Sequence, residues 1–599
     1  MSSKNFFFGG LISGLFASLI LLFALWGIWL LPSLGLLLTR VDIINGTIVV
    51  ALLGVTGGLL YGLIIRERQL SVMNRALAGA IVGLVLWLGG VLTLVPMMLG
   101  FPPSLKSPQD HLVTLIIFVV YGLALAFVYH RLGAKGSARS LGYGLSLLLL
   151  AVVAMPLLLH GAVSTDPENL ELPPGYRAQV IAKGLTYPTS LAIDEEGVIY
   201  VAESGFTYGP KTTTAQILKV KEGGKLAKIA DKFEGPIGGL TYKDGNLYIS
   251  HRGKITELEL KTGKRRDLIT NLPSLGDHHN GDLLFGPDGA LYFGQGTATN
   301  AGVVGSDNFV YAWADRHPEF HDVPSRDFTL TGENYSSLDL KSTDPTAKKT
   351  TGAFAPFGQT REAGEKVKGE VPASGAVHRY DMEAETLTIF ADGLRNPYGL
   401  TQDPEGNIYA SVLGYDDRGV RASTNSPDWI MKLKEGAWYG WPDFVGTIPL
   451  GAEGFASERG INRNPLIQDP PEVTPPLSSL PSHYSPMKMA YAPEEFPQQG
   501  IFVAIFADGQ PLTQDLERQL PSGVMIVDPE TGQYDWFAKS KHKARAGRLG
   551  DGFKRAIDVK FTNDGQALYV LDFGVWEFAD MAPNAIPKSG VLWKISKEE

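Results

Sequence analysis

The chain has 599 residues, no cysteine and 44% hydrophobic residues, with 53 Lys and Arg against 62 Asp and Glu. The lack of cysteine excludes disulfide scaffolds, Cys-ligated zinc, iron–sulfur clusters and thiol nucleophiles. The charge is divided unevenly, because residues 1–163 hold only 9 of the basic and 3 of the acidic side chains and are net positive, whereas the remainder is net negative. No basic stripe marks a nucleic-acid surface, so we expect no nucleic-acid partner.

Residues 1–163 are predicted to form a multi-pass α-helical transmembrane region held in membrane lipid. A helix needs about 20 residues to span the hydrocarbon core, and five uncharged runs are at least that long. These runs are Asn5–Thr39, Ile43–Ile65, Ala76–Leu105, His111–His130 and Ser140–Thr165. A signal peptide would give a single short stretch and a soluble helix a polar face, and neither fits. We expect about five helices, although the proline at Leu31–Leu34 could divide the first run.

The basic residues of the short loops predict the orientation of this region. Seven Lys and Arg lie in the loops of one side and two in the loops of the other. The side with more basic residues is usually cytoplasmic, which places the N-terminus in the cytoplasm and everything beyond Thr165 on the periplasmic or extracellular side. Transport pathways usually carry charged residues within the spans, and these runs have none. We therefore expect a cell-membrane anchor rather than a transporter.

A polar linker, 164–175, precedes a repeat that occupies 176–599. Each copy is a short apolar strand, a turn of the Asp-Gly type and a second strand centred on tyrosine, which is the pattern of a β-hairpin. The copies are Ser190–Tyr200, Gly239–Tyr248, Gly281–Tyr292, Gly399–Tyr409, Ile557–Tyr569 and a degenerate one at Lys488–Ala504. Hairpins at such spacing indicate propeller blades, so six copies predict an all-β six-bladed β-propeller. The long interval after the third copy predicts an insertion at about 303–372 that covers one face.

Two motifs precede the third and fourth copies and therefore lie at the mouth of the expected central channel. The first is Asp277–Asp282, in which His278 can act as a general base near neutral pH. The second is Leu394–Leu400, in which Arg395 offers a forked donor for negative charge and Asn396 offers both a donor and an acceptor. The alternative is a turn that only satisfies its own backbone, with a solvated arginine beside it.

Further candidates follow the fourth copy. The loop Gly414–Asp417 can bind calcium through main-chain carbonyls, including those of Gly414 and Tyr415, or it can be a solvated acidic loop. The turn Tyr439–Pro442 is rigid and aromatic, and it can equally be a packing element. The run Tyr311–His321 is interpreted as a packed lid loop, with a substrate groove as the alternative.

Three motifs in this order resemble the glucose/sorbosone dehydrogenase family: Asp-His-x-x-Gly before a Phe-Gly-Pro-Asp-Gly turn, Arg-Asn-Pro-x-Gly-Leu, and Tyr-Gly-Trp-Pro. The resemblance covers Pro173 to the C-terminus. It implies a six-bladed quinoprotein that uses pyrroloquinoline quinone (PQQ) and calcium. It further implies the following roles: His278 as the base, oriented by Asp277; Arg395 stabilising the reduced cofactor; Asn396, Tyr439 and Arg555 binding the cofactor; and the carbonyls of Gly414 and Tyr415 holding calcium.

The sequence departs from the family pattern at several cofactor positions. Ile557 stands where a second arginine is expected, and Asp282 replaces the usual arginine or a similar residue. No lysine lies around Phe506–Asp508, and the loop Gly235–Gly239 lacks a glutamine seen in glucose-oxidising members. PQQ carries three carboxylates, so the loss of cations weakens its electrostatic anchoring by roughly 1.5–3 kcal/mol for each charged hydrogen bond.

The resemblance and the His278/Arg395 pair predict a membrane-anchored quinoprotein dehydrogenase. It would oxidise a sugar or related alcohol outside the cytoplasm and pass electrons to a membrane quinone. One alternative is a calcium-dependent lactonase-like hydrolase on the same architecture, with Glu203 as a possible ligand of a metal that polarises a carbonyl. Another is a propeller without catalytic activity that binds a partner or a glycan, in which packed side chains would fill the channel.

Overall fold

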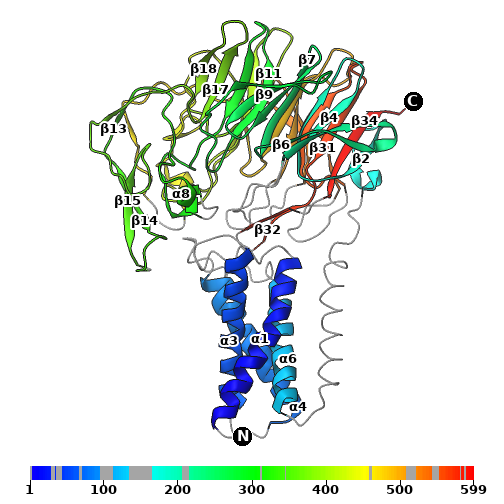
Figure 1. The fold of residues 1–599 in the computed structure, drawn as a ribbon. Helices are drawn as coiled ribbons and strands as arrows, with labels where there is room; N and C mark the ends of the chain where they lie inside the picture. The colour runs from blue at the N-terminus through cyan, green and yellow to red at the C-terminus, as the bar shows by residue number, and fades with distance from the viewer. Residues whose placement is uncertain are drawn as a thin grey trace. The chain divides into compact units, whose positions relative to one another are not determined.

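The structure is a computed structural model of the chain, shown in Figure 1. The described residues are 3–27, 34, 43–65, 70–94, 112–133, 165–204, 215–309, 313–344, 346–457, 462–507, 521–541, 552–579, 582–585 and 588–598. The chain divides into two compact units. The helical unit comprises Met1–Ala162, Val310–Ala312 and Phe578–Asn584, and the β unit comprises the rest.

The helical unit contains α1 (Ser3–Gly27), α3 (Ile43–Ile65), α4 (Val72–Leu86), the π-helix η2 (Trp87–Leu94) that continues α4, and α6 (Leu112–Gly133). Three of its stretches are long and apolar enough to cross a membrane, namely Gly46–Ile65, Val72–Leu94 and Leu112–Arg131. The apolar stretch in α1, Gly9–Leu25, is shorter. The predicted fifth run, 140–165, lies outside the described residues except for Thr165.

Glycines bring the helices of this unit into backbone contact. A Cβ on Gly14 would overlap the carbonyl oxygen of Gly54, and a Cβ on Gly58 would overlap that of Gly10, so α1 and α3 touch at two glycine pairs. A Cβ on Gly122 of α6 would overlap the carbonyl of Gly79 in α4. Small residues that allow helices to approach closely are typical of packing in membranes.

In the β unit, each copy of the sequence repeat forms an antiparallel pair of strands. The pairs are β3 (Pro188–Ile193) with β4 (Ile199–Glu203), β7 (Ile237–Lys243) with β8 (Asn246–His251), β11 (Asn280–Phe285) with β12 (Leu291–Gln295), β19 (Pro397–Gln402) with β20 (Ile408–Val412), β26 (Pro486–Tyr491) with β27 (Ile501–Ile505), and β30 (Ala556–Phe561) with β31 (Ala567–Asp572). The alternating apolar residues and the Asp-Gly type turns predict these pairs.

Further strands extend each pair into a sheet of four or five strands. They are β5 (Ala215–Val220), β6 (Leu226–Phe233), β9 (Lys254–Glu259), β10 (Arg265–Ile269), β17 (Ala376–Asp381), β18 (Thr386–Asp392), β21 (Asp428–Lys432), β25 (Ser478–Leu480), β28 (Gly523–Val527), β29 (Tyr534–Ser540), β1 (Leu170–Glu171), β34 (Gly590–Lys597) and β2 (Tyr176–Leu185). In the sheet β2-β34-β31-β30, an early strand of the unit pairs with its last strand.

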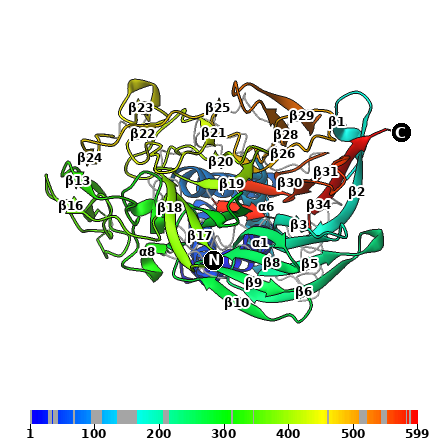
Figure 2. The same ribbon diagram turned by 90° about the horizontal axis from the view of Figure 1, so that it is seen from above.

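The first strands of the sheets contact one another in a closed circle. Strand β3 contacts β7, β7 contacts β11, β11 contacts β19, β19 contacts β26, β26 contacts β30, and β30 contacts β3. Figure 2 shows the sheets around this circle from above. The β unit is therefore propeller-like, as the repeat predicts.

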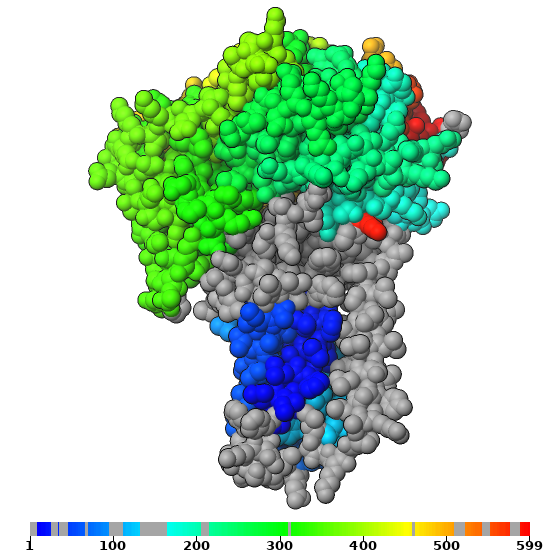
Figure 3. Space-filling view, in the orientation of Figure 1, coloured from blue at the N-terminus to red at the C-terminus, as the bar shows by residue number. Residues whose placement is uncertain are grey.

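Small elements lie between the sheet strands. Those between β12 and β17 are η6 (Ser306–Phe309), α8 (Trp313–Arg316), β13 (Phe328–Leu330), β14 (Asn334–Leu338), β15 (Lys348–Gly352) and β16 (Lys366–Val367), which fall in the predicted insertion. The others are β22 (Phe444–Val445), β23 (Ile448–Pro449), η7 (Glu453–Phe455), β24 (Ile467–Gln468), η4 (Pro167–Asn169), η5 (Glu222–Gly224), β32 (Trp576–Ala579) and β33 (Ala582–Ala585). Strand β13 pairs with both β16 and β24. In Figure 3 the insertion is part of the green lobe at the lower left.

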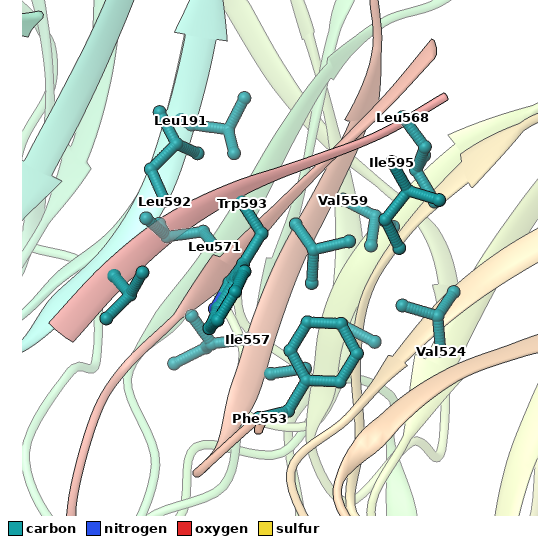
Figure 4. Packing of buried hydrophobic residues seen from close by; sticks show 14 of the residues in the cluster. Leu191, Val524, Phe553, Ile557, Val559, Leu568, Leu571, Leu592, Trp593 and Ile595 are labelled. Carbon is teal, nitrogen blue, oxygen red and sulfur yellow. The ribbon is translucent and has the colours of Figure 1, made fainter. Parts of the chain in front are cut away.

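Large apolar side chains from several sheets form the main core of the β unit. Figure 4 shows part of it, in which Phe553, Ile557 and Trp593 lie close together with the side chains of β28, β31 and β34. All three are almost completely buried. Burying one such side chain stabilises the fold by roughly 1.5–3 kcal/mol.

Candidate active site

The site residues predicted from the sequence, other than Tyr439, lie at one edge of the circle of strands. The first strands begin side by side: Thr189 in β3 donates to the carbonyl of Ile237 in β7 at 2.7 Å, and a Cβ on Gly281 in β11 would lie 3.0 Å from the carbonyl of Pro397 in β19. His278 lies two residues before β11, and the Arg395/Asn396 pair directly precedes β19. We call this edge, at which the first strands begin, the mouth.

The imidazole of His278 is held by Thr297. Its Nδ1 lies 3.0 Å from the carbonyl oxygen of Thr297 and 3.2 Å from Oγ1 of the same residue. A carbonyl only accepts hydrogen bonds, so Nδ1 carries the proton and Nε2 keeps its lone pair. His278 is half-buried. The structure thus presents His278 as a neutral ring with an unprotonated Nε2.

Gly296 brings the two sequence motifs together. A Cβ at this position would overlap Cβ of His278 and would lie 2.8 Å from Oδ1 of Asn396. The next residue, Thr297, donates its main-chain N–H to the carbonyl of Arg395 at 3.0 Å. The segment 296–297 therefore lies between His278 and the Arg395/Asn396 pair, and only glycine leaves room for that approach.

A chain of ion pairs runs along the mouth. Arg395 Nη2 lies 2.7 Å from Asp416 Oδ2, and Arg418 Nε lies 3.0 Å from the same oxygen. Arg418 Nη2 lies 2.6 Å from Asp277 Oδ2, and its Nη1 lies 3.3 Å from Asp307 Oδ2. Charge-assisted contacts at these distances are strong and directional. They join the segment that carries His278 to the segment that carries Arg395.

These charges set the protonation states of the site. Burial and the positive charges of Arg395 and Arg418 hold the pKa of His278 well below its usual range. Burial works against the charged form of Asp416, but the same two guanidinium groups outweigh it and hold the pKa of that carboxyl far below its usual value. Near neutral pH, His278 is therefore an unprotonated base beside two cations and an ionised Asp416.

The expected role of Asp277 is corrected by this geometry. Asp277 was predicted to orient His278, but its carboxylate binds Arg418, and Thr297 holds the imidazole instead. Arg418 itself is missed by the sequence reasoning. Its position two residues after Asp416 gives no signal, because its partners Asp277 and Asp307 come close only through the fold.

The loop with Gly414 and Tyr415 is fixed through its amide groups. Gly414 N–H donates to Asp428 Oδ1 at 2.7 Å, and Tyr415 N–H donates to Ser426 Oγ at 2.9 Å. Within the described part of the chain, neither carbonyl oxygen of this pair accepts a hydrogen bond. Two main-chain oxygens at the mouth are thus available to a hard cation such as calcium.

Tyr439 does not reach the mouth. It is buried, and its hydroxyl donates to the carbonyl of Lys432 at 2.8 Å, at the end of β21 that lies away from the mouth. Two residues further on, Trp441 donates Nε1–H to the carbonyl of Asn300 at 3.2 Å, and Arg395 Nε donates to the same carbonyl at 3.2 Å. The aromatic turn therefore supports Arg395 through Trp441, whereas Tyr439 is a packing residue.

Two buried cations precede β30. Arg555 donates from Nη1 to the carbonyl of Lys554 at 3.3 Å and to that of Phe506 at 3.5 Å. Lys554, which is not among the predicted site residues, directly precedes Arg555 and is also buried. Ile557, at the position of a missing second arginine, packs into the apolar core instead (Figure 4).

A buried charge cluster lies inside the circle of first strands. Lys488 Nζ in β26 donates to Ser190 Oγ in β3 at 2.5 Å, and it lies 3.5 Å from Asp282 Oδ1 in β11 and 3.9 Å from Asp558 Oδ2 in β30. Asp282 therefore serves as a partner of Lys488. Polar side chains from four strands meet inside the circle, while His278 remains at its edge.

Glu203 does not behave as a free metal ligand. Its two oxygens accept from Thr186 N–H and Gln216 Nε2–H, both at 2.6 Å. Burial raises the pKa of its carboxyl, and these two hydrogen bonds oppose the rise. Among the described residues, no three His, Cys, Asp or Glu side chains gather in a way that could hold a metal ion.

Comparison with known protein families finds no family that matches the chain. The chain is 25% identical over 184 residues to quinoprotein glucose dehydrogenase B of Acinetobacter calcoaceticus, a match that spans 30% of this chain and 29% of that enzyme. Similar solved structures include a PQQ-bound aldose sugar dehydrogenase from Streptomyces coelicolor (16% identity, 72% of this chain and 100% of that one, TM-score 0.41). Another is the apo form of a soluble aldose sugar dehydrogenase from Escherichia coli (16% identity, 71% of this chain and 100% of that one, TM-score 0.40).

Proposed function

We propose that the β unit is a six-bladed propeller dehydrogenase that oxidises a hydroxyl group of a sugar or related alcohol. One observation carries this proposal: His278 presents an unprotonated Nε2 at the mouth, beside the guanidinium groups of Arg395 and Arg418. The sequence similarity to a quinoprotein glucose dehydrogenase supports an oxidation at a CH–OH group.

The chemistry follows from the protonation states. Oxidation of CH–OH to a carbonyl removes a hydride from carbon and a proton from oxygen. His278 Nε2 takes the hydroxyl proton, a general-base step worth typically 10²–10⁴-fold in rate. Thr297 keeps the ring in the required tautomer. Arg395, held in place by Asp416, stabilises negative charge that develops on the hydride acceptor.

The residues at the mouth fit the donor requirements of PQQ and calcium. PQQ supplies the two-electron acceptor for the hydride when it is bound. Arg555 and its neighbour Lys554 would hold its carboxylates, and Asn396 would contact it from the side of His278. The carbonyls of Gly414 and Tyr415, which accept no hydrogen bond from the described residues, would hold Ca²⁺.

The helical unit is proposed to anchor the enzyme in the cell membrane, with the N-terminus in the cytoplasm and the β unit outside. The three long apolar helices and the basic loops support this orientation. A membrane quinone is the proposed final electron acceptor.

The orientation can be tested by labelling. Since the chain has no cysteine, Lys4→Cys and Arg177→Cys can each be labelled in intact cells with a membrane-impermeant maleimide. Labelling of the Arg177→Cys variant alone is expected, and the reverse pattern would overturn the orientation.

The catalytic proposal is tested on the full chain in detergent, supplied with PQQ and CaCl₂, by sugar-dependent reduction of a dye. His278→Gln should lower kcat by about 10²–10⁴-fold with little change in thermal stability, because the loss of the base removes proton abstraction. His321→Gln is the matched control, since His321 lies in the insertion, where its Nδ1 is 2.6 Å from the carbonyl oxygen of Glu319. Absence of activity with a panel of aldoses, or full activity in His278→Gln, would reject the proposal.

A further inference from the structure

A cluster of cationic and aromatic side chains lies beside the mouth, outside the machinery assigned above. We call it the Trp313 cluster, and it consists of Arg252, His279, Trp313, Arg316 and His317. The guanidinium carbon of Arg252 lies 5.0 Å from the centroid of the Trp313 ring, and that of Arg316 lies 4.8 Å from it. The ring of His279 meets Trp313 edge-on at 5.7 Å, and His317 stacks on Trp313 at 6.2 Å. Two arginines and two histidines thus pack against one buried indole.

Part of the Arg252 guanidinium lacks a hydrogen-bond acceptor among the described residues. Its Nε and Nη2 are shielded from solvent, and no described residue accepts a hydrogen bond from them. Burial and the nearby Arg316 lower the pKa of Arg252 to about 10, and the opposing influence of Glu234 is weaker. Stacking on an indole offsets only part of the cost of shielding these nitrogens from water. An anionic ligand that accepts hydrogen bonds from this guanidinium would compensate its positive charge.

The cluster is connected directly to the segment that carries the proposed base. Asn280 donates Nδ2–H to the carbonyl of His251 at 2.9 Å and accepts from Gly253 N–H at 3.1 Å, so the Arg252 turn is fixed to the 277–280 segment. His279 Nδ1 lies 3.1 Å from the carbonyl of Ser274, which places the proton on Nδ1 and leaves Nε2 as an acceptor. A hydroxyl group and an anionic group could both be bound here.

We propose that the Trp313 cluster binds the anionic group of a sugar acid or sugar phosphate, with Arg252 and Arg316 as its cationic ligands and His279 Nε2 accepting from a sugar hydroxyl. This inference rests on the proposed function and narrows its substrate class to anionic sugars. A carboxylate and a phosphate share the chemistry that two guanidinium groups recognise, and the ligands in the test separate the two.

The test is calorimetric titration of the full chain in detergent, without PQQ, with glucose, glucuronate and glucose 6-phosphate. At least one anionic sugar should bind about tenfold or more tightly than glucose, since a charged hydrogen bond is worth roughly 1.5–3 kcal/mol. Arg252→Gln and Arg316→Gln should each remove most of that preference. The matched control is Arg177→Gln, on the exposed face of β2, which should keep it. If Arg252→Gln does not fold, Arg316→Gln decides the result.

The outcomes separate this inference from the proposed function. Preference for glucuronate alone would identify the ligand class as sugar acids, and preference for glucose 6-phosphate alone would identify it as sugar phosphates. Either result supports an anion site at the Trp313 cluster. Anion-selective binding without any dehydrogenase activity would reject the proposed function and keep the site. Equal affinity for glucose and both anions, or a preference unchanged in both arginine variants, would overturn the site even in an enzyme that oxidises sugars.

Discussion

Different kinds of contact stabilise the inside of the helical unit and the inside of the β unit. In the helical unit, glycines bring backbones together, as at Gly58 against Gly10, and few polar side chains of its described residues are buried. In the β unit, large apolar side chains from several sheets pack together, and ion pairs such as Arg421 with Asp443 are buried. Water drives the burial of apolar surface. Lipid, the environment proposed for the helical unit, gives helices no such force, so that close packing decides their association there. The two units therefore should respond to different substitutions.

The largest effect is expected from Arg421→Met in the β unit. Arg421 Nη2 lies 2.7 Å from Asp443 Oδ1, and Nη1 donates to the carbonyls of Ala301 at 2.7 Å and Pro442 at 3.0 Å. Removing one partner of a buried pair leaves Asp443 as an uncompensated charge, which costs about 3–5 kcal/mol. The free energy of unfolding is measured by tryptophan fluorescence of the full chain in urea.

The same substitution at an exposed site provides the control for this prediction. Arg177→Met lies on the exposed face of β2 and should change the free energy of unfolding by less than about 0.5 kcal/mol. Equal effects of the two variants would contradict the view that buried ion pairs hold the β unit. The transition of the helical unit should not shift in either variant.

The second effect concerns pH. Burial raises the pKa of Asp322 to about 7, although Ala298 N–H donates to it at 2.6 Å. A carboxyl with a raised pKa in the folded state stabilises the fold below its unfolded pKa, and that stability is lost as pH rises through about 7. Asp322 should therefore contribute about 3 kcal/mol less at pH 8 than at pH 5. Buried histidines such as His279, whose pKa burial lowers to about 3, act in the opposite direction.

Comparison with Asp322→Asn isolates this contribution. The difference in unfolding free energy between wild type and Asp322→Asn should change by about 3 kcal/mol between pH 5 and pH 8 in favour of the variant. Asp535→Asn, at an exposed position, should show no such change. A difference that is flat with pH would show that Asp322 is ionised throughout, and the electrostatics assigned to this part of the β unit would be wrong.

The third effect belongs to the helical unit. Leucine at Gly58 would meet the carbonyl of Gly10, so Gly58→Leu should separate α1 from α3 and cost about 1–3 kcal/mol. Gly89→Leu is the matched control, because no atom lies within 4 Å of a Cβ at that position. Helicity of the full chain is followed during titration with SDS. An equal loss in both variants would contradict glycine-mediated packing, and the β unit should keep its unfolding midpoint in both.

The sequence predicts the parts of this molecule that depend on local pattern. Alternation and Asp-Gly type turns predict strand pairs such as β11 with β12, and the position of His278 and Arg395 just before first strands predicts that they share an edge. The direction of the Tyr439 side chain has no local signal, because it depends on the carbonyl that its hydroxyl binds, here that of Lys432. Contacts between distant segments, such as Arg418 with Asp277, have no local signal.

The smallest effect is expected where the helical unit has an exposed polar contact. Arg75 Nη1 lies 2.6 Å from His130 Nδ1, joining the start of α4 to the end of α6. Exposed polar pairs contribute roughly 0.2–1 kcal/mol, because water competes for both partners. A double-mutant cycle of Arg75→Gln and His130→Gln, measured by SDS titration, should give a coupling energy below about 1 kcal/mol. A coupling of about 2 kcal/mol or more would show that polar contacts compete with glycine packing in this unit, and the contrast with the β unit would then fail.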